Sequence, residues 1–413
     1  MAEWVMKKLK DIADFNPRES LAKGVVAKKV AMDKLQPFCR DIPGYELEPF
    51  SGGTKFRNGD TIMARITPCL ENGKTAKVAV LDDGEVGFGS TEYIVFRAKD
   101  GIDEDFIYYL VCSPFVREPA IKSMVGSSGR QRVQTDVVQN LEIMVPDYEE
   151  QKRISGILKS LDDKMVANTE VNKNLEEQAV VLFRSWFSAF SLSPNSPRVN
   201  SEFGEIPEDF AVVKVGSLPM LVTDYVANGS FASLKANVNL YQEPNYAYFI
   251  RNTDLKSGSF GVFVDQHSYE FLSKSTLFGG EIIISNVGDV GSVFLCPKLD
   301  GRMTLGNNII MLRPEGDHLR YYLYIWFKYL QGQALIQGIK GGSAQPKFNK
   351  TDFKNTSVLI PPKDMLSRFH ETVAPMFETI SQRQTETSRL ADLRDTLLPQ
   401  LMSGEIDVSN LDL

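Results

Sequence analysis

Two short segments carry side chains that can hydrogen-bond the bases and phosphates of DNA. Residues 126–134 read GSSGRQRVQ, and residues 340–350 read KGGSAQPKFNK. Arginine and lysine suit guanine and phosphate, asparagine and glutamine suit adenine, and glycine lets the backbone approach a duplex. The candidate DNA-binding residues are Arg130, Gln131, Arg132 and Gln134 in the first segment, and Gln345, Lys347, Asn349 and Lys350 in the second. The alternative is that both segments are solvated surface loops.

Other basic and amide side chains lie elsewhere in the same two halves of the chain. These further candidates are Lys55, Arg57 and Arg65 in the first half, and Arg251, Asn252, Asn286, Arg302, Asn307 and Asn308 in the second. Each could also be a turn residue or a solvated charge. The acidic stretches 41–48, 82–85 and 100–105 are expected to face away from DNA.

The composition excludes several other kinds of chemistry. The chain has 413 residues, a net charge of −7, and only four cysteines and three histidines, which are widely spaced. No metal site is therefore predicted, and scattered thiols fit a reducing cytoplasm. Gly73-Lys74-Thr75 resembles the end of a phosphate-binding loop, but Pro68 stands where that motif requires glycine. No apolar run predicts a signal peptide or a membrane span.

The elements that must position the two basic segments occur twice in the chain. FRNGDTIM at residues 56–63 parallels LFGGEIII at 277–284, an offset of 221, and YIVFR at 93–97 parallels IIMLR at 309–313, an offset of 216. The offset of 216 also relates Pro146 to Pro362. Several matches in one order at a nearly fixed offset indicate an internal repeat.

Each copy begins with a β-rich domain. Short runs rich in Ile, Val, Phe and Tyr, bounded by Gly, Asp, Asn or Pro, predict strands. They cover residues 61–66, 76–81, 93–96 and 141–145 in the first copy, and 282–285, 292–295, 308–312 and 357–360 in the second. Residues 105–112 and 319–330 predict amphipathic helices on these domains.

Each copy ends in a long helix with a heptad seam. The seam residues include Leu158, Leu161, Met165, Asn168, Asn172 and Leu175 in the first helix, and Val373, Ile380, Arg383, Thr387, Leu390 and Leu397 in the second. Polar residues in the middle of a seam fix register and orientation at a cost in stability. Their presence in both helices favours an antiparallel coiled coil; the alternative is that each helix packs on its own domain.

The predicted fold class is α+β, with two mixed, β-rich domains separated by two long helices and related by a pseudo-two-fold repeat. The domains are expected at residues 1–147 and 207–362 and the helices at 148–190 and 363–404. Residues 191–206, which contain the sequence SLSPNSP, predict a linker, and residues 405–413 predict a short exposed tail.

With these features in this order, the chain resembles the specificity subunits of type I DNA restriction-modification systems over nearly its whole length. The matching motifs are LEIMVP at 141–146, EEQ at 149–151, LE at 175–176, LFRSWF at 182–187, GEIPE at 204–208 and LLPQLMSGEI at 397–406. Two departures are Phe210, where the family usually has tryptophan, and Ser367, where the second copy often has glutamine.

The resemblance implies a non-catalytic subunit of a cytoplasmic methyltransferase and endonuclease complex, without a membrane segment. Each β-rich domain would be a target recognition domain that reads half of a bipartite double-stranded DNA sequence. The helices would set the spacer and dock two methyltransferase subunits through outward residues near the helix ends, such as Arg184, Trp186, Phe187, Arg394 and Leu398. The alternative for Trp186 and Phe187 is packing within the coiled coil. Those subunits would bind S-adenosylmethionine, and translocating restriction subunits would join them. This chain itself would hold no cofactor.

Two other classes of function stay open at this point. One is a coiled-coil scaffold whose β-rich domains bind protein instead of DNA. The other is a self-sufficient nuclease or methyltransferase with an unfamiliar motif, since the sequence contains no D-P-P-Y, N-P-P-F or Walker A motif.

Overall fold

The computed structural model describes residues 4–342 and 345–409, so that Ser343 and Ala344 of the second basic segment and the last four residues of the tail lie outside the described residues. The chain forms two compact units. Unit 1 combines residues 1–167 with residues 386–413, and unit 2 is formed by residues 168–385. Each of the two long helices therefore contributes one segment to unit 1 and another to unit 2.

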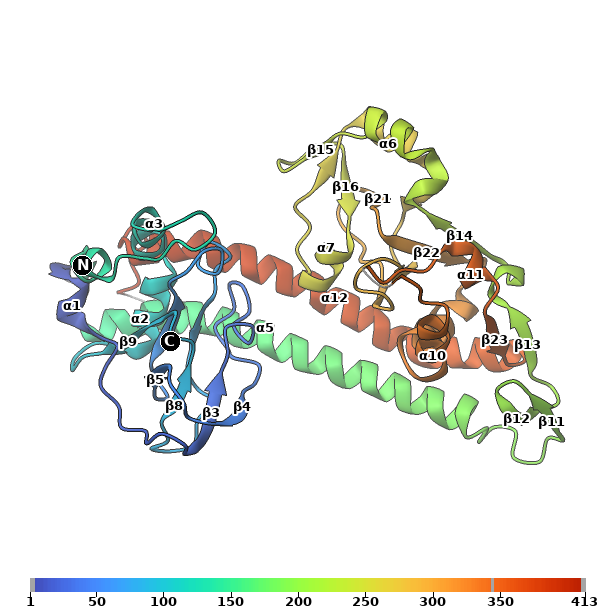
Figure 1. Cartoon of the computed structure of the whole chain (residues 1–413), viewed down its shortest axis with the longest axis horizontal. Helices are drawn as coiled ribbons and strands as arrows, with labels where there is room; N and C mark the ends of the chain where they lie inside the picture. The colour runs from blue at the N-terminus through green and yellow to red at the C-terminus, as the bar shows by residue number, and fades with distance from the viewer. Residues whose placement is uncertain (1–3, 343–344, 410–413) are drawn as a thin grey trace. The chain divides into compact units, whose positions relative to one another are not determined.

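Unit 1 contains ten strands and the first five helices among the described residues. The strands are β1 (Val5–Lys8), β2 (Ala13–Phe15), β3 (Val26–Val30), β4 (Glu46–Pro49), β5 (Thr54–Phe56), β6 (Thr61–Ala64), β7 (Thr75–Lys77), β8 (Gly87–Gly89), β9 (Tyr93–Ala98) and β10 (Glu142–Val145). The helices are α1 (Leu9–Ile12), α2 (Glu104–Cys112), α3 (Pro114–Lys122), α4 (Thr135–Gln139) and the first part of α5 (Tyr148–Phe183) (Figure 1).

Unit 2 begins within α5. Its strands are β11 (Arg198–Ser201), β12 (Gly204–Pro207), β13 (Ala211–Lys214), β14 (Met220–Asp224), β15 (Leu240–Tyr241), β16 (Ala247–Ile250), β17 (Phe263–Val264), β18 (Thr276–Leu277), β19 (Ile282–Ser285), β20 (Val293–Leu295), β21 (Arg302–Leu305), β22 (Ile309–Pro314) and β23 (Ser357–Ile360). Its helices are α6 (Phe231–Asn237), α7 (Asn252–Ser257), α8 (Gln266–Phe271), α9 (Arg320–Lys328), α10 (Leu330–Gly338), α11 (Lys350–Lys354) and the first part of α12 (Lys363–Met402). Single helical turns are η1 (Arg184–Ser188), η2 (Val215–Ser217), η3 (Tyr225–Asn228), η4 (Ser273–Ser275) and η5 (Asp317–Leu319).

The sheet topology of unit 1 is repeated in unit 2. The antiparallel sheet β2-β9-β6-β7 corresponds to β14-β22-β19-β20, and the pair β1-β10 corresponds to β13-β23. The second sheets are β4-β3-β8-β5 and β15-β17-β16-β21-β18, and each contains one parallel pair, β3 with β8 and β16 with β21. The internal repeat predicted from the sequence offset is therefore present in the fold.

An ion pair also repeats at the predicted offset. Arg97 on β9 donates to Asp60 over 2.7 Å, and Arg313 on β22 donates to Glu281 over 3.0 Å. In both units the carboxylate precedes a strand that is buried along its whole length, β6 or β19. This pair joins the two central strands of each antiparallel sheet.

A buried helix follows β9 in unit 1 and β22 in unit 2. Asp103 caps α2 by accepting a hydrogen bond from the N–H of Phe106 over 2.8 Å. Six consecutive residues of α2, 106–111, and seven of α9, 321–327, are buried. These helices lie against the long helices of their own unit: Tyr109 donates to Asp162 over 2.6 Å in unit 1, and Tyr324 donates to Glu176 over 2.6 Å in unit 2.

The two long helices are α5 (Tyr148–Phe183) and α12 (Lys363–Met402), where the sequence predicts helices at 148–190 and 363–404. Helix α5 begins after Asp147, whose Oδ1 accepts a hydrogen bond from the N–H of Glu150 over 2.9 Å, and it continues into the π-helical turn η1. Helix α12 runs through Pro375 without ending. The twelve seam residues named above are all buried or half-buried. Within unit 2, Arg383 on α12 donates to Asn168 on α5 over 2.8 Å.

Some local predictions differ from the fold. The strand expected at residues 76–81 ends at Lys77, and the helix expected at 319–330 breaks at Tyr329, whose backbone is extended at φ −129° and ψ 165°. Gly332 permits the return of the chain, because a Cβ there would collide with the carbonyl of Trp326. Within the part of the chain that the structure describes, no helix has the length and apolar composition to cross a membrane.

The predicted linker and tail are more ordered than expected. Within residues 191–206 and just beyond, β11 and β12 form a hairpin whose Ile206 joins the core of unit 2. The tail expected to be exposed returns to unit 1, where Ile406 packs against the core and Val408 is 0% exposed. Both segments contain apolar residues that pack against the core of their unit, Ile206 in unit 2 and Ile406 and Val408 in unit 1.

Several helix residues expected to face partner subunits point inward instead. Phe187 is buried among aromatic rings of unit 2, and its ring centroid is 5.0 Å from that of Phe369. Arg394 and Leu398 are buried in unit 1. Trp186 is half-buried and Arg184 is exposed. The heptad spacing explains the burial of Arg394, which lies four residues after Leu390 and three before Leu397 and therefore falls on the seam; Leu398 directly follows Leu397.

Candidate nucleic-acid interface

The first basic segment forms an exposed hairpin loop in unit 1. Arg132 and Val125 exchange two backbone hydrogen bonds, of 2.9 and 3.1 Å. Arg132 also forms a β-bridge with Ile66, which lies two residues beyond β6. These contacts join the two legs of the loop to each other and fix the second leg to the segment that follows β6, and residues 126–130 are exposed between the legs.

Two glycines shape the tip of this loop. Gly129 has φ +76°, in the left-handed region. Gly126 has φ +137°, and a Cβ there would lie 2.9 Å from the carbonyl oxygen of Arg130. Glycine relieves both constraints because it has no side chain. The loop can therefore present Arg130 to solvent on a tight turn.

A carboxylate orients Arg132. Nε and Nη2 of Arg132 donate to Oε1 of Glu92 over 2.9 and 2.7 Å, and Nε also lies 3.0 Å from Oε2. The hydrogen bond from Arg132 lowers the pKa of Glu92. The backbone of Glu92 is itself fixed, because its N–H donates to Oγ of Ser90 over 3.1 Å and its carbonyl accepts from the N–H of Arg65 over 2.9 Å. Arg132 thus has a defined orientation on an exposed loop.

Arg65 supports the same loop from the sheet. Its carbonyl accepts a hydrogen bond from the N–H of Val133 over 2.9 Å, and its Nη2 donates to the carbonyl of Val133 over 3.0 Å. The positive charge of Arg65 also contributes to the lowered pKa of Glu92. We call Arg65, Glu92 and Arg132 the unit 1 cluster.

The same hydrogen bonds recur in unit 2 with different side chains. Lys347 exchanges two backbone hydrogen bonds of 2.9 Å with Gly341 and bridges Val287. Asn286 accepts from the N–H of Phe348 over 3.0 Å through its carbonyl, and its Nδ2 donates to the carbonyl of Phe348 over 3.2 Å. The N–H of Asn286 donates to the carbonyl of Asn308 over 3.1 Å.

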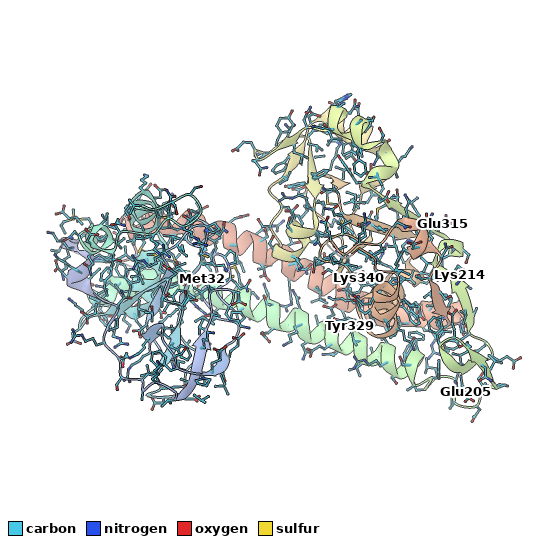
Figure 2. The ribbon with its side chains drawn as sticks, viewed as in Figure 1. Met32, Glu205, Lys214, Glu315, Tyr329 and Lys340 are labelled. Carbon is cyan, nitrogen blue, oxygen red and sulfur yellow. The ribbon has the colours of Figure 1, made fainter. Side chains whose placement is uncertain are left out.

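Asn286, Asn308 and Lys347 therefore occupy the positions of Arg65, Glu92 and Arg132, and we call them the unit 2 cluster. Figure 2 shows Lys340 at the start of the loop that carries Lys347, just after α10. Asn308 has φ +65°, a conformation that asparagine tolerates better than most residues. Arg132 forms an ion pair with Glu92, whereas no carboxylate within the described residues forms one with Lys347; because Arg65 is also charged, each cluster carries one net positive charge.

The structure places the other candidates outside these clusters. Lys55 donates to the carbonyl of Glu19, and Arg57 forms an ion pair with the carboxylate of Glu19. In unit 2, Arg251 forms an ion pair with Asp254 and Lys350 with Asp224. Arg302 lies over the ring of Tyr246. The side chain of Asn349 caps α11 by accepting a hydrogen bond from the N–H of Asp352. Gln134 occupies the equivalent N-cap position before α4. Asn307, Gln345 and the side chain of Arg130 are exposed, and Gln131 is half-buried. These interactions give Arg57, Arg251, Lys350 and Asn349 a role in folding whatever else they contact.

Glu92 is not among the residues that the sequence predicts as DNA-binding, because it is neither a cation nor an amide. Its signal was present in the sequence, because Glu92 and Asn308 are 216 positions apart, which is the offset that relates β9 to β22. Because Asn308 is one of the predicted DNA-binding residues, the repeat predicts that its equivalent, residue 92, occupies the same position in the first domain.

The structure thus contains two equivalent β-rich domains, each with a loop of hydrogen-bonding side chains at the same position relative to its sheet. A model of the family described as the Type I restriction modification DNA specificity domain matches residues 1–177 and again residues 207–384. The chain belongs to this family.

Named relatives and a solved structure agree with this assignment. The chain is 27% identical over 319 residues to the Type I restriction enzyme MjaIX specificity subunit of Methanocaldococcus jannaschii, which covers 76% of this chain and 71% of the relative. It is 24% identical to the HindI specificity subunit of Haemophilus influenzae, over 89% of each chain. The crystal structure of a Type-I restriction-modification system S subunit from M. genitalium has the same fold, with a TM-score of 0.52 and 16% identity over 97% of this chain and 96% of that chain.

Proposed function

We propose that this chain is the DNA sequence-recognition subunit of a type I restriction-modification complex and that its two domains read the two halves of a bipartite target. The observation that carries the proposal is the repeated loop cluster. Its backbone hydrogen bonds are shared by both units, while its side chains differ at all three positions. A common scaffold with different hydrogen-bonding groups is suited to reading two different base sequences.

The long helices serve, in this proposal, as the spacer between the two half-sites. Contacts within each unit support an antiparallel coiled coil, because they pair rising residue numbers on α5 with falling numbers on α12. In unit 1 Asp162 meets Arg394 and Lys164 meets Glu386. In unit 2 Asn168 meets Arg383 and the ring of Phe183 meets that of Phe369. A helix of 40 residues such as α12 spans about 60 Å at about 1.5 Å per residue.

Catalysis belongs, in this proposal, to partner subunits. Two methyltransferase subunits that bind S-adenosylmethionine would dock on the helices, and restriction subunits would join them. The net charge of −7 fits this division, since a chain with only local basic loops gains little from nonspecific attraction to phosphates. Partners would then supply much of the electrostatic affinity for DNA.

A selection experiment tests this function. The full chain is assembled with the modification subunits of its own system and incubated with random duplexes, and the bound duplexes are sequenced. We expect two short defined sequences separated by a spacer of fixed length. The chain alone should retain the same sequences more weakly. Methyl transfer or cleavage by the chain alone, or retention of no defined sequence in either state, would contradict the proposal.

A further inference from the structure

We propose that Arg132 reads a guanine in the half-site of the first domain and that Glu92 is the positioning residue that aims its guanidinium group. This inference rests on the proposed function and names one base contact within it. The first observation is that Glu92 contacts the Nε and Nη2 side of the guanidinium group of Arg132.

The ion pair occupies one edge of the guanidinium group and leaves another edge available. Nε and Nη2 of Arg132 form the edge that donates to the carboxylate of Glu92. Nη1 makes one long contact, of 3.4 Å, with the carbonyl of Arg130. A guanidinium group has five N–H donors in a planar fork. One N–H on Nη2 remains free, and the long contact of Nη1 is weak enough for an approaching base to displace. The end of the group can therefore offer two adjacent donors, one from each of these nitrogens.

Two adjacent donors in one plane match the acceptors of guanine. Guanine presents N7 and O6 to the major groove, and a bidentate contact from arginine is the commonest way to recognise them. Adenine has a donor in place of O6 and cannot accept both N–H groups. The side chain of Arg132 is 45% exposed, so a base edge can reach it, and that of Glu92 is 24% exposed beneath it.

Glu92 changes what Arg132 can do electrostatically. The carboxylate neutralises the guanidinium charge, which weakens its attraction for any phosphate that approaches. It also restricts the rotamers of Arg132, so less conformational entropy is lost when a base binds. A neutral, oriented pair favours base recognition over phosphate binding. In unit 2 the equivalent pair is Asn308 and Lys347, in which an amide replaces the carboxylate, so this device belongs to the first domain alone.

The test measures base preference position by position in the assembled complex. Sequencing of selected duplexes gives the preference at every position for the wild type and for four variants. Arg132→Gln and Arg132→Lys remove the bidentate donor, and the lysine variant keeps the charge. Glu92→Gln removes the positioning carboxylate and keeps the size of the side chain. Lys29→Gln is the matched control, because Lys29 forms a similarly exposed ion pair with Glu48 elsewhere in unit 1.

We expect both Arg132 variants to lose a guanine preference of roughly ten- to hundredfold at one position of one half-site, with the other positions unchanged. Glu92→Gln should lose most of the preference at that same position while its affinity for random DNA is unchanged or higher. A merely structural role would instead weaken all positions of the half-site together. Lys29→Gln should select the wild-type target.

The failures of the two proposals are distinguishable. If the wild type selects a bipartite target but both Arg132 variants keep every base preference, Arg132 does not read guanine and the inference is overturned, while the proposed function stands. If Arg132 matters and Glu92→Gln keeps the preference, Glu92 does not position it. If the wild type selects no defined sequence, the proposed function itself fails.

Discussion

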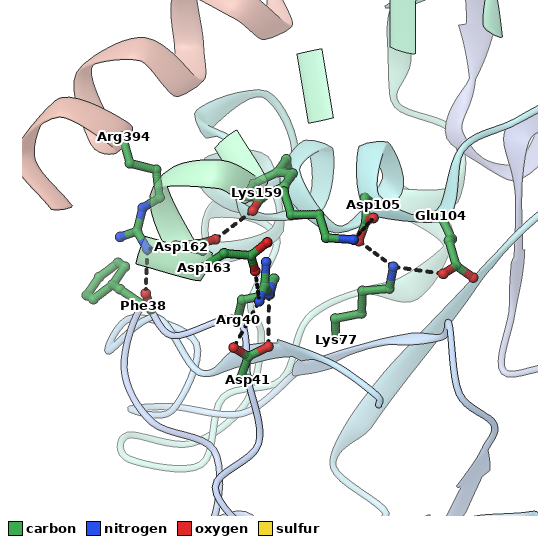
Figure 3. A network of polar contacts seen from close by, with 11 residues as sticks. Phe38, Arg40, Asp41, Lys77, Glu104, Asp105, Lys159, Asp162, Asp163 and Arg394 are labelled. Atoms are coloured by element: carbon green, nitrogen blue, oxygen red, sulfur yellow. Dashed lines mark hydrogen bonds and ion pairs between the residues drawn. The ribbon is translucent and has the colours of Figure 1, made fainter. Parts of the chain in front are cut away.

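Nη1 of Arg394 donates a hydrogen bond of 2.9 Å to Oδ1 of Asp162 in the interior of unit 1, where the two side chains are 10% and 4% exposed. The second oxygen of Asp162 accepts from Tyr109, and Nη1 of Arg394 also donates to the carbonyl of Phe38 over 3.0 Å. Figure 3 shows this pair beside the more exposed contacts of Arg40 with Asp41 and Asp163. One buried pair thus joins α5, α12, α2 and a loop of the first domain.

Breaking this buried pair should destabilise unit 1 strongly. In an Asp162→Asn variant Arg394 loses its buried counter-ion and keeps only the ion pair with Asp395, whose side chain is 58% exposed. Because removal of one partner of a buried pair costs about 3–5 kcal/mol, the loss should approach that range. Urea unfolding of the full chain measures the change. The control is Asp163→Asn, the neighbouring residue, whose ion pair with Arg40 is solvent-exposed at the carboxylate and whose loss should cost about 1 kcal/mol or less. Equal losses in the two variants would contradict a special role for the buried pair.

If the proposed function is correct, the two basic loops should act on separate half-sites. The double charge reversal Arg130→Glu and Arg132→Glu should weaken recognition of one half-site by roughly a hundredfold or more and leave the other unchanged. Lys347→Glu should affect only the second half-site. Competition with duplexes that carry one altered half measures both effects. Loss of both half-sites together, or of solubility, would instead assign these residues a role in folding.

Asp265 should contribute to stability in a defined pH range. Hydrogen bonds from Ser268, including its N–H at the start of α8 over 2.8 Å, lower the pKa of Asp265 from 3.8 to about 2. A lowered pKa in the folded state means that the stabilisation is complete above the unfolded value near 4 and is lost as the pH falls towards 2. Asp265→Ala should therefore cost about 1 kcal/mol at pH 7, and the difference from wild type should shrink below pH 4.

Two measurements check this expectation. Urea unfolding of wild type and variant at pH 7 and pH 3 gives the difference in free energy, and NMR titration of the Asp265 carboxyl gives its midpoint. Glu270→Gln is the control, because Glu270 lies on the exposed side of the same helix. A midpoint near 4 for Asp265 would contradict the capping role.

The sequence predicted the features of the fold that depend on long patterns and missed those that depend on single contacts. The repeat and both long helices are encoded over many residues, so the sequence pattern indicates them without tertiary contacts. The offset itself changes from 221 at Ile66 and Val287 to 216 at Glu92 and Asn308, which places a five-residue difference between β6 and β9. The break at Tyr329 and the burial of Val408 depend on tertiary contacts that no local pattern records.

The candidate site shows the same division. Composition identified the basic loops and therefore Arg132 and Lys347, the residues that the structure places at equivalent positions. It could not show that Arg57 is already paired with Glu19, because those residues are distant in sequence. Glu92 was overlooked since a carboxylate is an unfavourable neighbour for DNA unless an arginine neutralises it, and that pairing exists only in the folded chain.

The polar layer between the long helices should fix register at a cost in stability. Asn168 is fully buried and accepts a hydrogen bond from Arg383, and the Nε of Arg383 is buried without a hydrogen bond within the described residues. Replacing both residues with leucine should leave the free energy of unfolding unchanged or raise it by about 1–3 kcal/mol, because the desolvation of buried polar groups is removed. The same variant should select DNA targets with less uniform spacers, since a helix pair without the layer can shift its register. Urea unfolding and sequencing of selected duplexes measure the two effects. The conservative control is Leu161→Met, an apolar seam exchange, which should keep the spacer. A double leucine variant with wild-type spacer uniformity would show that other contacts determine the distance between the half-sites.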